Sequence, residues 1–279
     1  MLPKASQPQL YEKPMHLEII LCTYDHESVH PRRFDKPKRD IVWRSVRSLM
    51  TAIKNAPDRY DINLVVLDDQ STDATQDFLR WETAFLGDKV SIETLSGTGN
   101  NASMLERLQR GKASDADLVY IVEDDYLHYP DALAVALDTW EKFYPLNPLP
   151  LMGMSLVDCA SNYRFDKYGR NDRKGDGSIA HIIGGTDRPW RTISHTGVTF
   201  LLEKGVLQNH WQPFEEIGYY WPYFEEEVTF NKLWNTSVGM YCPLVPLAYH
   251  LWEDHPYYPV KDLWEDSNPT DLKLVSAGV

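Results

Sequence analysis

The chain alternates between short apolar runs and longer segments with helical periodicity over its first 145 residues. Four apolar runs are nearly continuous, as expected for parallel strands that are covered by helices on both faces. They are HLEIILCT, YDINLVVLDD, KVSIETL and DLVYIVEDD, which start at His16, Tyr60, Lys89 and Asp117. This pattern predicts an α/β fold with a mostly parallel sheet that is flanked by helices.

A segment of helical spacing follows each of these strands. In residues 40–56 the apolar positions recur at three- and four-residue intervals, and Pro130 lies near the start of the last such segment, residues 129–144. After Pro145 the pattern becomes looser. There we expect a strand in residues 195–203, a short helix in 223–234 and a last strand in 239–250.

These changes of pattern divide the chain. Residues 1–14 contain several prolines and no apolar run, so we expect a flexible N-terminal arm. Residues 15–145 hold the regular strand–helix alternation, and residues 146–279 form a second part of the same domain.

The three cysteines, Cys22, Cys159 and Cys242, are far apart and form no CxxC pair, which argues against a disulfide framework or a zinc site. No apolar run reaches the roughly 18 residues that indicate a membrane span, and the N-terminal arm lacks the apolar stretch of a signal peptide. We therefore expect a cytoplasmic protein with no transmembrane segment.

The chain is acidic, with a formal net charge of 28 − 41 = −13. Such a charge argues against binding to nucleic acid or to an anionic membrane, since both require a basic face. It leaves room for a nucleotide ligand, because a metal ion can neutralise the phosphates.

Acidic residues follow two of the predicted strands, as the pairs Asp68–Asp69 and Asp124–Asp125, the second preceded by Glu123. The carboxyl ends of parallel strands meet at one edge of a sheet, where ligands bind in folds of this class. Adjacent carboxylates repel each other, so they are either exposed to solvent at a strand end or neutralised by a metal ion. We favour the metal site.

Other nucleotide and phosphate chemistries fit the sequence less well. Phosphatases of the haloacid dehalogenase type need Asp-x-Asp after the first strand, whereas Gln70 occupies the position of the second Asp in LDDQST. A P-loop is absent, because GxxxxGK[ST] does not occur.

The segments LDDQSTDAT and VEDDYLHYP together resemble the two signature segments of family 2 glycosyltransferases with the GT-A fold. CTYD on the first strand resembles the opening segment of that family, HTGVTFLLE its acceptor-side glycine loop, and FEEEVTFNKLW its acidic motif for the catalytic base. The matches keep the family's order and run from about residue 16 to residue 250. The resemblance implies a GT-A fold, with a nucleotide-sugar-binding part in residues 15–145 and an acceptor-binding part in 146–279.

The resemblance also implies roles for the strand-end residues. Asp125 would bind Mn²⁺ or Mg²⁺, with His250 as a second ligand, although a lone histidine is often structural. Asp124 would contact the ribose or the donor sugar. Asp69 would accept a hydrogen bond from the imide N–H of a uracil-like base, or else only cap the strand end.

The nucleotide site should extend to the first and third strands. Tyr24 would stack on the base, unless it is an ordinary half-buried aromatic residue, and Asp25 would support the pocket. Members of the family often carry a basic residue after the third strand, but here none occurs before Arg107, so backbone amides at Gly97–Asn101 could make that contact. The expected nucleotide-binding residues are Cys22, Tyr24, Asp25, Asp69, Gly97, Asn101 and Asp124.

Two further groups of residues have open interpretations. The basic residues after the first strand could fold over a pyrophosphate or remain solvated; they are Arg32, Arg33, Lys36, Lys38 and Arg39. Alignment on the acidic motif places the catalytic base at Glu227, with Glu226 as the neighbouring candidate. Acidic residues are also favoured at a helix start for electrostatic reasons alone.

The acidic strand ends and the resemblance together imply a metal-dependent glycosyltransferase. It would move a sugar from a nucleoside-diphosphate sugar, UDP-sugar above others, to a hydroxyl of a glycan or another acceptor. The resemblance implies inversion at the anomeric carbon. The alternatives are a nucleotidyltransferase or phosphohydrolase that uses the same carboxylates, and a catalytically inactive protein that binds nucleotide sugars.

Overall fold

The computed structural model of the protein describes residues 15–27, 36–95, 99–158, 180–220, 229–251 and 261–267. They form a nine-stranded sheet, in the order β3-β2-β1-β4-β9-β6-β10-β8-β7, and a two-stranded sheet of β11 and β5. In the large sheet β8 and β9 run against the other strands. This arrangement confirms the expected fold class, an α/β protein with a mostly parallel sheet.

The first half of the chain contains the regular alternation. Its elements are β1 (Met15–Thr23), α1 (Lys38–Lys54), β2 (Tyr60–Asp68), α2 (Asp73–Thr83), η1 (Ala84–Lys89), β3 (Val90–Thr94), α3 (Asn100–Ala113), β4 (Leu118–Val122), β5 (Tyr126–His128), α4 (Ala132–Phe143) and η2 (Tyr144–Leu146).

The second half adds strands to the same sheet, so the sheet is continuous across residue 145. Its elements are β6 (Leu151–Met154), β7 (Ile182–Gly184), β8 (Pro189–Thr192), β9 (Phe200–Glu203), α5 (Lys204–Asn209), α6 (Trp211–Tyr220), η5 (Phe230–Leu233), β10 (Val238–Pro243), β11 (Ala248–His250) and α7 (Lys261–Asp266). Among the described residues no helix combines the length and the hydrophobicity that a membrane crossing requires.

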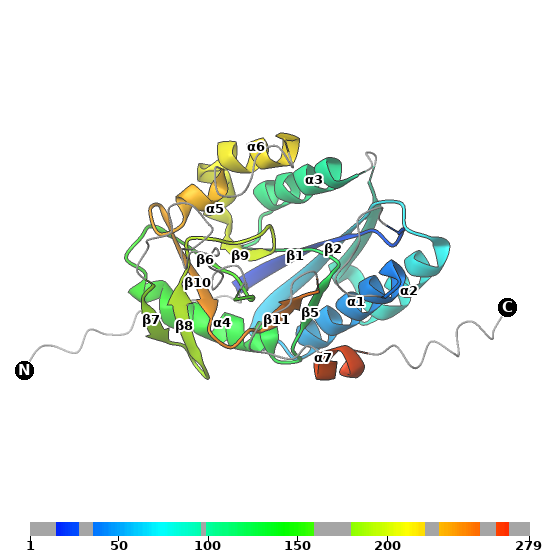
Figure 1. The fold of residues 1–279 in the computed structure, drawn as a ribbon, viewed down its shortest axis with the longest axis horizontal. Helices are drawn as coiled ribbons and strands as arrows, with labels where there is room; N and C mark the ends of the chain where they lie inside the picture. The colour runs from blue at the N-terminus through cyan, green and yellow to red at the C-terminus, as the bar shows by residue number, and fades with distance from the viewer. Residues whose placement is uncertain are drawn as a thin grey trace, which may run out of the picture.

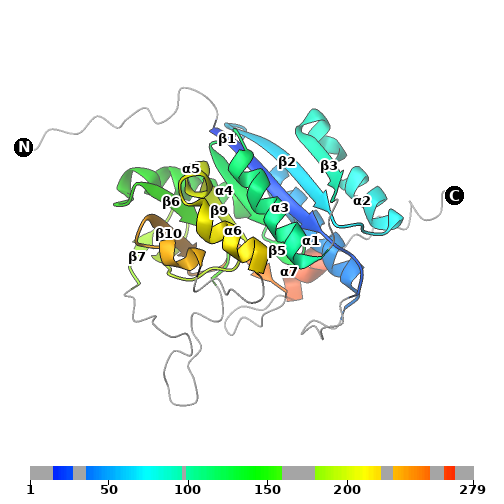
Figure 2. The ribbon, with the colours of Figure 1, turned by 90° about the horizontal axis from the view of Figure 1, so that it is seen from above.

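Helices cover both faces of the sheet, with α1, α2 and α4 on one side and α3, α5 and α6 on the other (Figure 1). Seen from above, α3 lies along β1 and next to α6 (Figure 2). Because side chains alternate along a strand, Ile19 faces α1 and α4, whereas Ile20 faces α3. The central strands are therefore buried on both faces, which explains their continuous apolar sequence.

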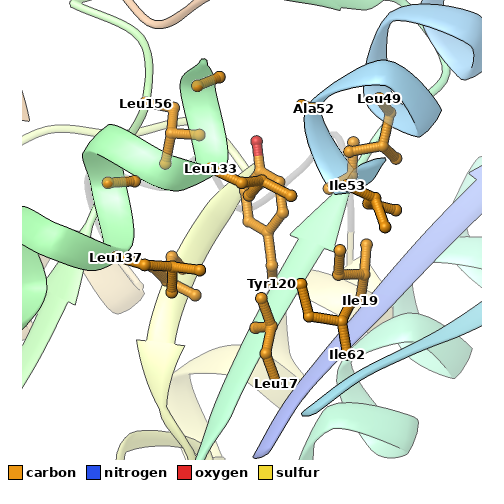
Figure 3. Packing of buried hydrophobic residues seen from close by; sticks show 14 of the residues in the cluster. Leu17, Ile19, Leu49, Ala52, Ile53, Ile62, Tyr120, Leu133, Leu137 and Leu156 are labelled. Atoms are coloured by element: carbon orange, nitrogen blue, oxygen red, sulfur yellow. The ribbon is translucent and has the colours of Figure 1, made fainter. Parts of the chain in front are cut away.

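Tyr120 of β4 occupies the middle of the core under α1 and α4 (Figure 3). Its side chain is fully buried among leucines and isoleucines of β1, α1 and α4. Its hydroxyl forms a 2.8 Å hydrogen bond with Nε2 of His128 in β5, so the buried polar end is satisfied. This contact holds β5 close beneath the core helices.

The last predicted strand, in residues 239–250, is divided into β10 and β11, which belong to different sheets. Pro243 and Pro246 explain the division, because proline has no N–H to donate to a strand ladder. In the same way, the predicted strand in residues 195–203 begins only at Phe200, and His195–Thr199 form a loop.

Candidate functional site

Strand pairing brings the predicted carboxylates to one edge of the sheet. The central strand β1 is parallel to both β2 and β4. Thr23 lies opposite Asp68, and Leu21 lies opposite Val122. The residues that follow the three strands therefore come together, as the sequence predicts.

The two aspartates that end β2 have different surroundings. Asp68 accepts hydrogen bonds from the Thr23 hydroxyl (2.9 Å) and the Ser71 amide (3.1 Å), so it holds the turn in place. This turn includes Gln70 in a left-handed conformation (φ 58°), which costs energy for a residue with a side chain. Asp68 is therefore a structural residue.

Asp69 is also buried, and its two carboxylate oxygens have different surroundings. Oδ2 accepts a hydrogen bond from the amide of Gly99 (2.9 Å), which precedes α3. Gly99 has a φ of 93°, a conformation that glycine adopts without strain. Oδ1 is buried and has no hydrogen-bond partner among the described residues. Between β2 and α3 the structure thus has a buried acceptor oxygen that no described residue satisfies.

The residues after β1 contribute one exposed and one structural side chain. The Tyr24 ring is 40% exposed and lies 5.3 Å from the ring of His26, so one face of this site is aromatic. Asp25 is buried and accepts hydrogen bonds from the amide and hydroxyl of Thr72 and the hydroxyl of Thr75, at the start of α2. Burial opposes ionisation of Asp25, yet these hydrogen bonds lower its pKa. Asp25 therefore supports the site through α2.

Asp124 is buried at the end of β4, and both of its carboxylate oxygens are occupied. Oδ2 accepts a hydrogen bond from the Tyr24 amide (2.7 Å), and Oδ1 is paired with the ammonium group of Lys38. Burial raises the pKa of Asp124 and Lys38 opposes the shift. Asp124 thereby connects the end of β4 to the end of β1 and to the start of α1.

Asp125 and His250 form an ion pair, with 3.4 Å between Oδ2 and Nε2. The pairing of β5 with β11 places His250 opposite Tyr126, and the two rings stack at 4.5 Å. Burial by itself raises the pKa of Asp125, but His250 lowers it well below its usual range. The Oδ1 atom of Asp125 is buried and has no hydrogen-bond partner in the described part of the chain.

These two residues fit a metal that is bound in part by its substrate. Within the described ranges, no cluster of three or more His, Cys, Asp or Glu side chains lies close enough together to enclose a metal ion. Mg²⁺ commonly takes only one or two protein carboxylates, together with waters and substrate phosphates. The unpartnered oxygen of Asp125, with His250 beside it, is a suitable incomplete ligand set.

Arg107 is a site residue whose role the sequence does not reveal. It lies on α3, is 2% exposed, and pairs with Glu123 at 3.3 Å. It offsets one of the three consecutive acidic charges after β4. An arginine on the apolar face of a helix, between Met104 and Leu108, is the sequence signal for a buried partner carboxylate.

Cys22 lies at the end of β1, on the face of the sheet that α3 covers. Burial raises the pKa of Cys22 to about 12, even though Arg107 acts in the opposite direction. The thiol is therefore neutral at physiological pH. Cys22 lines the base of the site as an uncharged, buried group.

Asn231 connects the two C-terminal motifs. Its Oδ1 accepts hydrogen bonds from the Thr196 amide (3.1 Å) and from the Trp234 indole. The Nδ2 amide group must then be the donor to Nδ1 of His195 (3.3 Å). In the same loop the Thr199 hydroxyl accepts a hydrogen bond from the Glu123 amide (3.3 Å), so the loop borders the acidic strand end.

The side chain of Asn101 is not directed into the site. The Asn101 side chain donates to the carbonyl of Tyr219 (3.2 Å) and links α3 to α6. Its backbone amide, in the first turn of α3, lacks an intrahelical acceptor and faces the helix start. Gly97, Glu226 and Glu227 lie outside the described residues.

No family model matches the sequence. No curated protein matches it either. Solved structures that are similar to the chain include the galactosyltransferase LgtC in complex with donor and acceptor sugar analogs. It has 14% identity and a TM-score of 0.46, over 80% of this chain and 72% of that one.

Two further similar structures are TarS and the bifunctional glycosyltransferase WbbM. TarS from S. aureus in complex with UDP has 16% identity and a TM-score of 0.45, over 74% of this chain. The bifunctional WbbM has 11% identity and a TM-score of 0.49, over 96% of this chain. The chain spans about half of each, 55% and 52% respectively. Likenesses at this level carry no argument about activity, which must come from the site.

Proposed function

We propose that the protein is a glycosyltransferase that uses a nucleoside-diphosphate sugar, with UDP-sugar as the favoured donor and a hydroxyl group of a glycan or another molecule as acceptor. One observation carries this proposal. At the carboxyl edge of the sheet, Asp69 and Asp125 each keep one buried oxygen without a hydrogen-bond partner among the described residues. A buried, unpaired acceptor costs about 1–3 kcal/mol, so a ligand that supplies a donor or a cation there gains that energy.

The two oxygens suit the two ends of a nucleoside diphosphate. Asp69 Oδ1 would accept the imide N–H of a uracil-like base, with the exposed ring of Tyr24 available to stack on the base face. Asp125 and His250 would hold Mn²⁺ or Mg²⁺ at the diphosphate. When bound there, the cation supplies charge neutralisation for the departing diphosphate.

The acceptor is expected on the other side of the acidic strand end. The 195–199 loop, which Asn231 anchors, lies next to Glu123. Glu226 and Glu227 come shortly before Asn231 in the sequence. One of these glutamates would remove the proton of the acceptor hydroxyl as it attacks the anomeric carbon. Direct attack from the face opposite the diphosphate inverts that carbon. In this proposal residues 15–145 bind the donor and 146–279 the acceptor.

The carboxylates suit two alternative functions as well. In a nucleotidyltransferase or a phosphohydrolase, a hydroxyl or water oxygen would attack a phosphorus atom, and a metal held by these carboxylates would neutralise the phosphate charge. An inactive protein would only bind the nucleotide sugar. Transfer differs from both, because it releases a nucleoside diphosphate only when an acceptor is present.

A thermal-shift panel of UDP, GDP, dTDP and CDP sugars, with Mn²⁺ and with EDTA, tests the proposal. A bound ligand stabilises the fold by RT ln(1 + [L]/Kd), so the correct donor raises the melting temperature most. The best donor is then incubated with candidate acceptors, and release of its nucleoside diphosphate is measured. The proposal fails if no donor raises the melting temperature under either condition.

A further inference from the structure

Lys38, at the start of α1, belongs to the basic residues that follow β1. Among those that the structure describes, it is the only one whose charged group pairs with an acidic residue at the strand ends. Lys38 pairs with Asp124, and the side chains are only 12% and 11% exposed. Its backbone amide donates to Glu27 (2.9 Å), which fixes the chain just before α1. Lys36, two residues earlier, is exposed. The structure thus distinguishes the largely covered Lys38 from its exposed neighbours Lys36 and Arg39.

The position of this lysine is not explained by stability alone. A buried ion pair contributes little net stability, because the loss of hydration offsets the attraction of the charges. Asp124 also accepts the Tyr24 amide at 2.7 Å, so it already links β4 to β1 without the lysine. Lys38 adds a positive charge in addition to this link.

The charge lies where a diphosphate would need it. The Lys38 ammonium lies 2.5 Å from Oδ1 of Asp124, and Asp124 directly precedes Asp125 in the chain. Asp125 carries the unpartnered oxygen that suits a metal ion. Arg107, a buried cation on the α3 face, is paired with Glu123. Lys38 is paired with Asp124, the residue next to Asp125, so it is the cation whose partner adjoins the proposed metal ligand.

We propose that Lys38 binds the diphosphate of the nucleotide donor, as a cation that the protein supplies beside the metal at Asp125. This inference rests on the proposed function. A lysine ammonium carries three donor hydrogens on a flexible stem, so it can contact a phosphate oxygen while it stays next to Asp124. The consequence is that part of the affinity for the diphosphate does not depend on metal.

The experiment is titration calorimetry on the full chain, with Mg²⁺ and with EDTA. The probes are the tightest-binding of UDP, GDP, dTDP and CDP, and the corresponding nucleoside, which has no phosphate. Lys38→Met removes the charge and keeps the stem, and Lys36→Met is the matched control on an exposed lysine. We expect Lys38→Met to lower the affinity for the nucleoside diphosphate roughly 10- to 100-fold, both with and without metal. This is the range for a lost charge-assisted hydrogen bond.

The nucleoside should bind Lys38→Met as it binds the wild type, and Lys36→Met should change neither ligand. An equal loss for nucleoside and nucleoside diphosphate, or no loss for either, would overturn the inference while wild-type binding still supports the proposed function. If the wild type binds none of the four diphosphates with Mg²⁺ or EDTA, the proposed function fails and the inference fails with it.

Removal of Lys38 leaves Asp124 buried without its cation, and the variant could fail to fold. The double variant Lys38→Met/Asp124→Asn avoids this, because the amide carries no charge. Its affinity for the nucleoside diphosphate is compared with that of Asp124→Asn alone, so that the difference between the two affinities reports the contribution of Lys38. Tighter diphosphate binding by Asp124→Asn than by the double variant supports the inference, and equal binding overturns it.

Discussion

His250 is paired with Asp125 across the small β5–β11 sheet, with 3.4 Å between Nε2 and Oδ2. The pairing is fixed by the backbone, because Leu251 donates its amide to the Asp125 carbonyl (2.8 Å). It is also fixed by the Tyr126 ring, which stacks on His250. The small sheet thus holds a carboxylate and an imidazole together at the edge where β4 ends, which is the arrangement from which the metal hypothesis follows.

Asp125→Ala should abolish the metal-dependent part of nucleotide binding and leave the fold intact. The side chain is 24% exposed and carries the oxygen that has no partner among the described residues, so its removal takes away the proposed metal ligand without opening the core. Calorimetry of UDP with Mn²⁺ and with EDTA measures the difference. Asp115→Ala, an exposed aspartate before β4, should behave as wild type. Equal UDP affinity in wild type with Mn²⁺ and with EDTA would show that Asp125 holds no metal.

The neighbouring residues Asp68 and Asp69 should respond differently to the same substitution. Asp69→Asn replaces the carboxylate that would accept the base N–H by an uncharged amide. The loss of this charge-assisted hydrogen bond should weaken nucleotide binding by about 1.5–3 kcal/mol. Asp68→Asn disturbs the turn that Asp68 holds, so it should mainly lower the melting temperature. Calorimetry and thermal melts of both variants provide the test. Unchanged affinity in Asp69→Asn would make Asp69 a strand-end cap.

Protonation of His128 should destabilise the protein below neutral pH. Burial lowers the pKa of His128 from 6.5 to about 4 in the folded state. The unfolded state therefore binds the proton first, and stability that is complete above pH 6.5 is lost as the pH falls toward 4. Between pH 7 and pH 5 the loss from this residue should be roughly 2 kcal/mol.

Urea unfolding at pH 7 and pH 5 measures this loss. His128→Gln keeps a polar group for the Tyr120 hydroxyl and removes the titration, so it should lose about 2 kcal/mol less than wild type between the two pH values. Identical pH dependence in both proteins would mean that His128 is charged in the folded state or is not buried.

The parallel sheet and the clustering of its carboxylates could be predicted from sequence because both follow from local patterns. Near-continuous apolar runs indicate buried parallel strands, and residues after such strands meet at one edge. The division of the last strand could also have been predicted from Pro243 and Pro246, since neither can donate a ladder hydrogen bond.

The pairing within the cluster could not be predicted in this way. Lys38 and Asp124 are far apart in sequence, and nothing local distinguishes Lys38 from the exposed Lys36. The distinction arises from tertiary packing, which places the start of α1 beside the end of β4. For the same reason the sequence could not show that Asp25 accepts hydrogen bonds from Thr72 and Thr75. Nor could it show that one buried oxygen of Asp69 has no partner among the described residues.

Asn231→Ala should destabilise the acceptor-side loop more than the donor site. Asn231 is 6% exposed; it accepts from the Thr196 amide and the Trp234 indole and donates to His195. Its loss removes the acceptor of the buried Thr196 amide, at a cost of about 1–3 kcal/mol, whereas the Trp234 indole keeps the Thr196 hydroxyl as a partner. We expect a lower melting temperature and nearly unchanged UDP affinity. Lys232→Ala, an exposed neighbour, is the control. An unchanged melting temperature would show that this network does not hold the loop.

Glu227→Gln should separate chemistry from binding. A general base acts on the acceptor hydroxyl, so the variant should keep its donor and metal affinity while kcat falls by roughly 10²–10⁴-fold. Glutamine nearly matches glutamate in shape, so the melting temperature should not change. Glu226→Gln is the matched control, because the alignment of the acidic motif could be shifted by one residue. If Glu226→Gln is the inactive variant, the base is Glu226 and the mechanism is retained. If both variants turn over at the wild-type rate with a confirmed acceptor, the base lies elsewhere and this acidic segment serves only helix electrostatics.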